Sequence, residues 1–128
     1  MPDSDEAPTD RSPTAARILD VAERLFQRRG YNAVSYADLA AELGLTTAAI
    51  HYHFPSKDDL GQAVVARYRR VNAKQRAAIR TETSALRARL QRYAELYAGV
   101  LADGGMCLCG VLAADEATLP EPVRREVR

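Results

Sequence analysis

The stretch from Ser35 to Lys57 holds the residues whose types and spacing best suit a binding chemistry. Ile50 and Phe54 are four residues apart and would form the buried side of a short helix. The opposite side would carry small, polar and aromatic residues, namely Thr47, Ala48, His51 and Tyr52, rather than the Glu, Lys and Gln of a solvated surface. Small residues let a helix approach a groove in DNA, where hydroxyl, phenol and imidazole groups can bond to phosphates and base edges.

Two short helices joined by a tight turn must position these side chains. Ser35 and Asp38 have the spacing of a capping box, which begins the first helix. Gly44 can adopt the left-handed conformation that ends it. Thr46 can cap the second helix, and Pro55 stops it near residue 54. This pattern predicts a helix-turn-helix, a motif that also occurs as mere packing, and the outward face described above favours DNA reading.

The rest of the chain predicts an all-α fold. A helix from Pro13 to Arg29, capped by Ser12, would pack across the pair and close a three-helix domain. A second capping box at Ser56 and Asp59 begins a long helix to about residue 80. Its apolar stripe would be Leu60, Val64, Tyr68, Val71 and Ile79.

Three further helices are expected in the C-terminal half. Thr83 or Ser84 would cap the fifth, whose inward residues would be Leu86, Leu90, Tyr93, Tyr97 and Val100. A sixth helix would run from Cys107 to Thr118 and a seventh from Val123 to Arg128, separated by two prolines.

Composition sets further bounds. The 128 residues suffice for one compact domain, and 47% apolar with 27% charged residues suits a soluble helical protein. Residues 1–11 begin acidic and Pro-rich, which predicts a disordered acidic tail rather than a signal peptide. No apolar run is long enough for a membrane span, so no membrane partner is expected. Two cysteines make no disulfide framework, and we expect a reducing cytoplasm.

Three runs of residues between 14 and 57 resemble a known protein family. The runs Thr14-Ala-Ala-Arg-Ile-Leu, Leu25-Phe-Gln-Arg-Arg-Gly-Tyr and Leu45-Thr-Thr-Ala-Ala-Ile-His-Tyr-His-Phe-Pro-Ser-Lys resemble the N-terminal domain of TetR-family transcriptional repressors. A weaker likeness continues at Gly105-Met-Cys-Leu-Cys-Gly-Val-Leu-Ala, similar to the start of the sixth helix in many members. The resemblance implies a DNA-binding domain over 12–57 and part of an effector-binding domain over 58–128.

The resemblance also implies sites and partners. The expected partners are double-stranded operator DNA with a palindromic sequence, a small apolar effector that releases the repressor from it, and a second copy in a homodimer. The DNA-binding residues would be Ser35, Tyr36, Thr47, Ala48, Ala49, His51, Tyr52, His53 and Lys57. Effector-binding residues would come from Leu90, Tyr93, Tyr97, Met106, Leu108 and Leu112, although the same stripe is equally consistent with core.

Other functions compete with this interpretation. Cys107 and Cys109 lie near a predicted helix start and could form a thiol-based redox sensor, although residues two apart on a helix point in different directions. His51 and His53 diverge in the same way, so we expect no metal, and no cofactor or enzyme constellation is present. The family's last helices, which usually form the dimer interface, have no counterpart here. We therefore expect a truncated or naturally short regulator, or else a helical interaction module without specific DNA binding.

Overall fold

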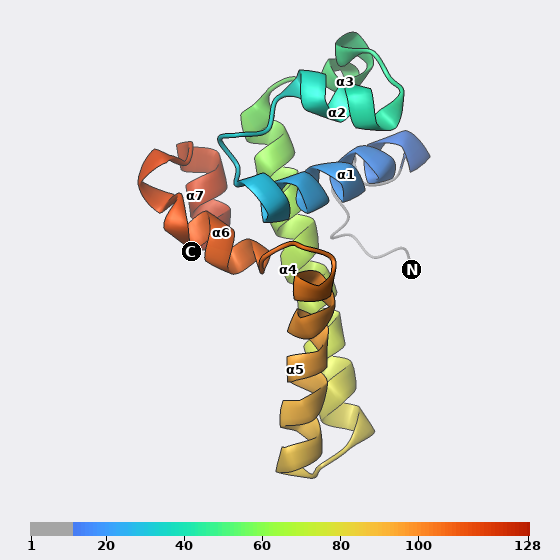
Figure 1. Ribbon diagram of the computed structural model, residues 1–128, viewed down its shortest axis with the longest axis vertical. Helices are drawn as coiled ribbons and strands as arrows, with labels where there is room; N and C mark the ends of the chain where they lie inside the picture. Colours follow the sequence, from blue (N-terminus) through green and yellow to red (C-terminus); the bar gives the residue numbers. More distant parts are fainter. Residues whose placement is uncertain (1–11) are drawn as a thin grey trace, which may run out of the picture.

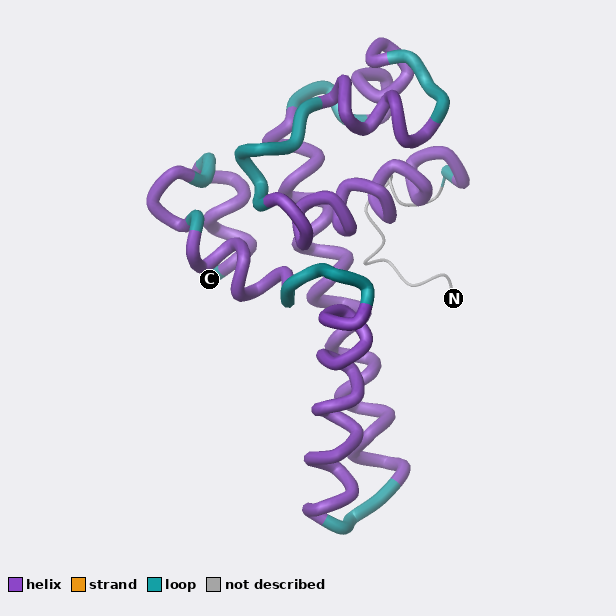
Figure 2. The backbone as a smooth tube through the Cα atoms, viewed as in Figure 1, coloured by secondary structure: helices purple, strands orange, loops and turns teal. Residues whose placement is uncertain are grey.

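The computed structural model describes residues 12–128, which form helices joined by short loops (Figures 1 and 2). The elements are α1 (Pro13–Arg29), α2 (Tyr36–Leu43), α3 (Thr47–His53), α4 (Lys57–Glu82), α5 (Leu86–Ala102), α6 (Leu108–Ala114), the 3₁₀ helix η2 (Glu116–Thr118) and α7 (Glu121–Val127). The predicted all-α class is confirmed, and Figure 2 shows no strand in this part of the chain. The acidic tail predicted for residues 1–11 lies outside the described residues.

Side-chain caps begin each of the first four helices where the sequence predicted them. Ser12, Ser35, Thr46 and Ser56 each accept a hydrogen bond from the backbone N–H three residues later, at N–O distances of 3.1 to 3.5 Å. The capping boxes at Ser35 and Ser56 are both complete. Gly44 has φ 65° at the end of α2, a conformation that a side chain would strain. Local chemistry therefore defines the first four helix starts.

The N-terminal core forms where α1 crosses beneath α2 and α3 and alongside the start of α4 (Figure 1). The buried face of α1 consists of Ala15, Ile18, Leu19, Ala22, Leu25 and Phe26, as its periodicity predicted. Ile50 and Phe54 bury the inner side of α3, and Leu60 and Val64 do the same for α4. The three-helix arrangement thus rests on a continuous apolar core to which α3 contributes only one side.

The helices after α5 return to this core. Val123 of α7 is fully buried against α4, where a side chain on Gly61 would come within 2.8 Å of it. The same missing side chain makes room for the Tyr31 ring, which would lie 2.7 Å from a Cβ at position 61. A glycine within α4 therefore lets both elements approach closely, which offsets its cost to helix stability.

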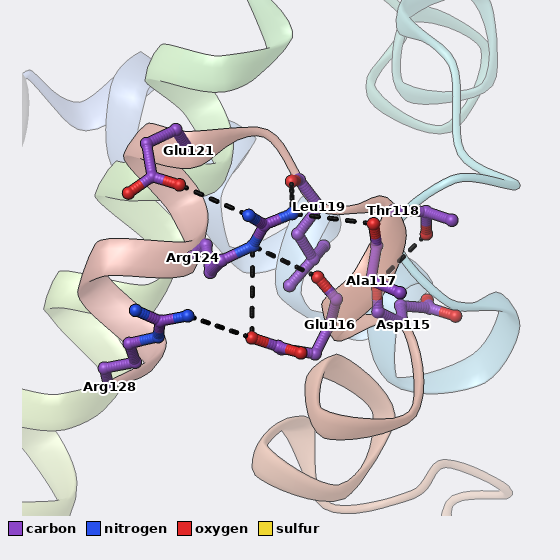
Figure 3. A network of polar contacts seen from close by, with 8 residues as sticks. All are labelled: Asp115, Glu116, Ala117, Thr118, Leu119, Glu121, Arg124 and Arg128. Carbon is purple, nitrogen blue, oxygen red and sulfur yellow. Dashed lines mark hydrogen bonds and ion pairs between the residues drawn. The ribbon is translucent and has the colours of Figure 1, made fainter.

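One arginine joins α7 to η2 (Figure 3). The Arg124 guanidinium donates to the backbone carbonyls of Glu116 and Leu119 at 3.2 and 3.1 Å. It also pairs with the Glu121 carboxylate at 3.3 Å, and Arg128 pairs with Glu116 at the same distance. Because carbonyls at the end of a helical turn lack internal partners, a five-donor side chain satisfies several of them at once. This network fixes the turn that follows α6.

The prediction that one face of α5 is buried is wrong. Leu86 and Leu90 are 71% and 59% exposed, Tyr97 is also exposed, and no residue of α5 is buried. The reason is topological: α5 packs against the distal part of α4, and in Figure 1 this pair extends away from the core. Val71 of α4, predicted to be buried, is exposed for the same reason.

Several predicted boundaries also shift. Helix α4 continues to Glu82, and the residue before α5 is Ala85, so neither Thr83 nor Ser84 caps that helix. The predicted sixth helix ends at Ala114, and η2 follows as a separate turn, because the Asp115 carbonyl accepts from the Thr118 N–H at 2.9 Å. Helix α7 begins at Glu121, two residues early. Residues 12–128 contain no helix long and apolar enough to cross a membrane.

We expect Ser56→Ala to lower the free energy of unfolding by about 1 kcal/mol, because the Asp59 N–H at the start of α4 loses its acceptor. Urea denaturation measures the change. Ser84→Ala is the matched control at a predicted cap that makes no capping bond, and its change should stay within about 0.5 kcal/mol. Equal losses in the two variants would contradict the capping role of Ser56.

Candidate DNA-binding surface

Helix α3 presents one side of itself to solvent. Thr47, Ala48, His51 and Tyr52 are exposed, whereas Ala49 and His53 are partly buried at the edges of this face. Ile50 and Phe54 anchor the opposite side in the core. Figure 1 shows α3 at one end of the molecule, with α2 beside it. The exposed side is therefore free to approach a large partner, and we call these four exposed residues the α3 face.

A buried tyrosine holds the end of α3 in place. The Tyr36 hydroxyl lies 2.8 Å from the backbone oxygen of Phe54 and 2.7 Å from that of Ser56. Burial, followed by the charges of Asp59 and Asp58, raises the pKa of Tyr36 to about 12. The phenol therefore stays protonated and donates to these carbonyls. Its phosphate contact stays a prediction, and it would require one of these internal hydrogen bonds to be exchanged for one to DNA.

His51 is held from two directions. Its Nδ1 lies 3.1 Å from the Pro55 carbonyl oxygen, and its ring packs on that of Tyr36 with centroids 4.4 Å apart. Tyr52, by contrast, is 83% exposed, and its ring meets the His53 ring edge-on with the ring centroids 5.1 Å apart. The α3 face thus combines one oriented imidazole with one phenol that is free to reach outward.

Lys57 occupies a position that residue type alone did not reveal. Its ammonium donates to the Tyr31 backbone oxygen at 2.7 Å and lies 4.3 Å from the centre of the Tyr31 ring. In return, the Tyr31 hydroxyl donates to the Lys57 carbonyl at 3.2 Å. Burial lowers the pKa of Lys57, and the nearby carboxylates of Asp38 and Asp58 oppose that effect. A contact between Lys57 and a phosphate must therefore compete with the hydrogen bond and the cation–π contact that Lys57 makes with Tyr31.

Ser35 is exposed at the start of α2, as the sequence predicted, but its hydroxyl is not free. It donates to the Asp38 carboxylate at 2.9 Å, and the serine N–H donates to the same oxygen at 2.8 Å. These hydrogen bonds lower the pKa of Asp38. The first turn of α2 thus offers unpaired backbone N–H groups beside one negative charge.

Tyr31 has a part in this site that the sequence reasoning missed. Its ring packs on Phe26, and its backbone oxygen accepts from the Lys57 ammonium. Its backbone N–H donates to the Asp115 carboxylate at 3.2 Å. The available signal was Gly61, because a glycine inside a helical pattern often marks a close approach by another group. The loop after α1 therefore connects the start of α4 with the end of α6.

The effector-binding residues predicted from the sequence do not come together. Leu108 and Leu112 are buried in the main core, whereas Met106 is 55% exposed and Tyr93 is partly buried on α5. Tyr97 lines an open groove of about 690 Å³ that is bounded mainly by α4, with Cys109 of α6 and Glu126 of α7 also in its wall. Leu90 is exposed on α5, and no enclosed apolar cavity within residues 12–128 contains all six predicted positions.

The two cysteines lie where α6 begins. Cys107 precedes the first helical residue with φ −51° and ψ 130°, and its sulfur lies 3.6 Å from the Tyr68 hydroxyl of α4. Because Cys107 is not helical, the expectation that the two side chains diverge on one helix does not apply. Burial tends to raise the pKa of Cys107, but hydrogen bonds from Tyr68 and nearby backbone N–H groups outweigh it, and the net shift is downward. Burial and the neighbouring Cys107 charge raise the pKa of Cys109.

Comparison with known proteins places the N-terminal geometry in context. A sequence model described as bacterial regulatory proteins of the tetR family matches residues 18–64, which run from α1 into α4. The HTH-type transcriptional regulator TtgR of Pseudomonas putida is 42% identical over 52 residues. That alignment covers 41% of this chain and 25% of the relative. The family-model match therefore includes α2 and all of α3, which carries the α3 face.

Two solved structures are similar over a longer range. A TetR transcriptional regulator from Legionella pneumophila superposes with a TM-score of 0.84 at 37% identity, over 91% of this chain and 64% of that one. A TetR-family regulator from Agrobacterium tumefaciens gives 0.82 at 38% identity, over 88% and 60%. The fold through α7 is thus that of these regulators, and the chain spans less than two thirds of either structure.

We expect Tyr36→Phe to lower the free energy of unfolding by about 1–2 kcal/mol, because the Phe54 carbonyl oxygen loses a buried donor, whereas the Ser56 carbonyl keeps the Leu60 N–H at 3.1 Å. Guanidinium denaturation measures the loss. Tyr52→Phe removes an exposed hydroxyl by the same chemistry and should change stability by less than about 0.5 kcal/mol. An unchanged denaturation midpoint for Tyr36→Phe would show that this hydroxyl does not hold α3.

Proposed function

Because the chain carries the N-terminal domain of the TetR family of transcriptional regulators, we propose that it is a cytoplasmic repressor that binds a palindromic operator through α3. Two copies would bind the two half-sites, since operator symmetry mirrors the symmetry of a dimer. The observation that carries this proposal is the α3 face, a patch of small, polar and aromatic side chains on a helix whose other side is anchored in the core.

The side chains of this surface divide into two roles. Thr47, Ala48, His51 and Tyr52 would meet the DNA directly: hydroxyl and phenol groups donate to phosphates, and an alanine methyl can touch a thymine methyl. Ala49 and His53 would contribute at the edges of the face, and the exposed start of α2 at Ser35 could offer N–H groups to a phosphate.

Tyr36 and Lys57 would support the DNA-binding surface from inside the protein. Their polar groups bond to backbone oxygens within the protein, so they orient the ends of α3 and α4 rather than reach outward. Direct phosphate contacts by these two residues would require their internal bonds to be exchanged for bonds to DNA.

Sequence discrimination would come largely from operator shape. Helix α3 has no Arg, Lys, Asn or Gln, the side chains that make bidentate contacts with bases. Each such contact supplies about 1–3 kcal/mol of discrimination, and α3 can make none. The protein would therefore select DNA that deforms easily into the bound geometry.

A small apolar effector would act through the contacts between the two halves of the chain. The Asp115 carboxylate accepts from the Tyr31 N–H, and Asn32 donates to the Thr118 hydroxyl at 2.7 Å. A displacement of α6 or η2 would pull on the loop that precedes α2. An effector releases DNA only to the extent that it binds the displaced state more tightly.

Thiol-based control is a second candidate, favoured by the contact between Cys107 and Tyr68. A hydroperoxide would convert the Cys107 thiolate to a sulfenate and leave as the alcohol. The Cys109 thiol would then attack the protonated sulfenic acid, forming a disulfide and releasing water. The lowered pKa of Cys107 suits the first step, and the disulfide would break a contact to α4.

We expect Tyr52→Ala to weaken binding about 10-fold or more to a palindromic duplex enriched from random sequence, because a hydrogen bond to a charged phosphate is lost. Fluorescence anisotropy at several salt concentrations measures both affinity and the number of phosphate contacts. Tyr97→Ala, an exposed tyrosine of α5, is the control and should bind normally. Weak binding without sequence preference in the unmodified chain would instead support a helical interaction module.

For the thiol candidate, we expect one equivalent of hydrogen peroxide to convert the protein to a species about 2 Da lighter, the mass of two lost hydrogens. Intact-mass spectrometry detects this change, and Cys109→Ser should instead gain one oxygen. DNA affinity is compared before and after treatment. Unchanged affinity in a fully oxidised sample would remove redox control from this protein.

A further inference from the structure

His51 is the one nitrogen-bearing side chain of the α3 face, and its ring is oriented before any DNA arrives. Nδ1 lies 3.1 Å from the Pro55 carbonyl oxygen. A carbonyl oxygen only accepts hydrogen bonds, so the proton of this contact must sit on Nδ1. The ring also packs on Tyr36 at 4.4 Å, and Tyr36 is itself held by Phe54 and Ser56. The protein therefore selects both the ring's position and its tautomer.

This tautomer determines what the other nitrogen can do. A neutral imidazole carries one proton, so Nε2 is a lone-pair acceptor once Nδ1 is the donor. His51 is exposed, and no hydrogen bond to its Nε2 is made by any residue from 12 to 128. An acceptor finds no partner in a phosphate oxygen, which is also an acceptor. Nε2 is thus unsuited to the DNA backbone and suited to a donor in the groove.

The major groove offers only one kind of donor. Adenine presents an N6 amine and cytosine an N4 amine, whereas guanine and thymine present acceptors at their N7, O6 and O4 atoms. We propose that His51 reads an amino base, adenine or cytosine, through Nε2 at one position of each operator half-site. This inference rests on the proposed DNA-binding function and adds which chemical class of base one residue selects.

His51 would distinguish which DNA strand carries the amino base, and it would not distinguish an A·T pair from a C·G pair. Every base pair carries one amine in the major groove, on adenine or on cytosine. An A·T pair replaced by C·G keeps an amine on the same strand, whereas its inversion to T·A puts a carbonyl oxygen there. His51 would thus tolerate the first change and reject the second, a pattern that differs from ordinary discrimination between A·T and G·C.

The other polar groups of the α3 face cannot impose this pattern. Thr47 and Tyr52 carry hydroxyls, which rotate and can both donate and accept. Ala48 offers only a methyl group to its partner. Among the four residues of the α3 face, the amino-base preference would therefore depend on His51, and it should disappear when the ring nitrogens of His51 are removed.

The test uses the full 128-residue chain at pH 8. Long-range proton–nitrogen NMR correlations first establish the His51 tautomer in the free protein, with His51→Phe used to assign its signals. Duplexes with random sequence are then selected by the wild-type chain and by His51→Phe, which keeps an aromatic ring over Tyr36. Circular dichroism confirms that the variant is folded.

We expect the Nδ1–H tautomer, and one position per half-site restricted to adenine or cytosine by the wild type only. Inverting that base pair should weaken wild-type binding about 10-fold, the loss of one hydrogen bond, and leave His51→Phe unaffected. The Nε2–H tautomer, or identical base preferences for both proteins, would overturn the inference while leaving DNA binding intact. Failure of the wild type to enrich any sequence would overturn the proposed function itself.

Discussion

The hydrogen bonds from Tyr36 to the ends of two other helices constrain everything that α3 can do. A helix of seven residues is far too short to be stable alone, so its position depends on its anchors. Ile50 and Phe54 bury the inner side of the helix in the core. The Tyr36 hydroxyl, bonded at the α3 terminus and the α4 cap, holds the end of the helix in place, and its ring supports His51. One side chain thus orients the exposed face from below.

A second interaction joins this domain to the rest of the chain. Tyr31 meets Lys57 of α4 on one side and Asp115 at the end of α6 on the other, and Gly61 leaves the space that its ring needs. The Arg124 network then ties α7 to the same turn. The N-terminal domain is therefore in direct contact with the C-terminal helices, through these hydrogen bonds and through the packing of α7 on α4.

Local chemistry made much of this architecture predictable, whereas long-range packing did not. The caps at Ser35 and Ser56 could be predicted because their partners are three residues away. The face of α3 followed from the spacing of Ile50 and Phe54. Periodicity places Leu86 and Leu90 on one side of α5 but cannot say whether another element covers that side. Likewise, the charge of Lys57 suggests a phosphate contact, and its bond to Tyr31, 26 residues away, could not be predicted from local spacing.

Within residues 12–128 no element covers one side of α5, and this affects how the 128-residue chain associates in solution. Its net charge is only +1 at pH 7 and its isoelectric point is about 7.8, so long-range repulsion between molecules is weakest near neutral pH. Exposed leucines on a protruding hairpin then favour loose, open-ended attraction. Such attraction grows steadily with concentration, whereas a symmetric pair saturates at two copies. The shape of the association curve, more than the average mass, therefore identifies a true dimer of this chain.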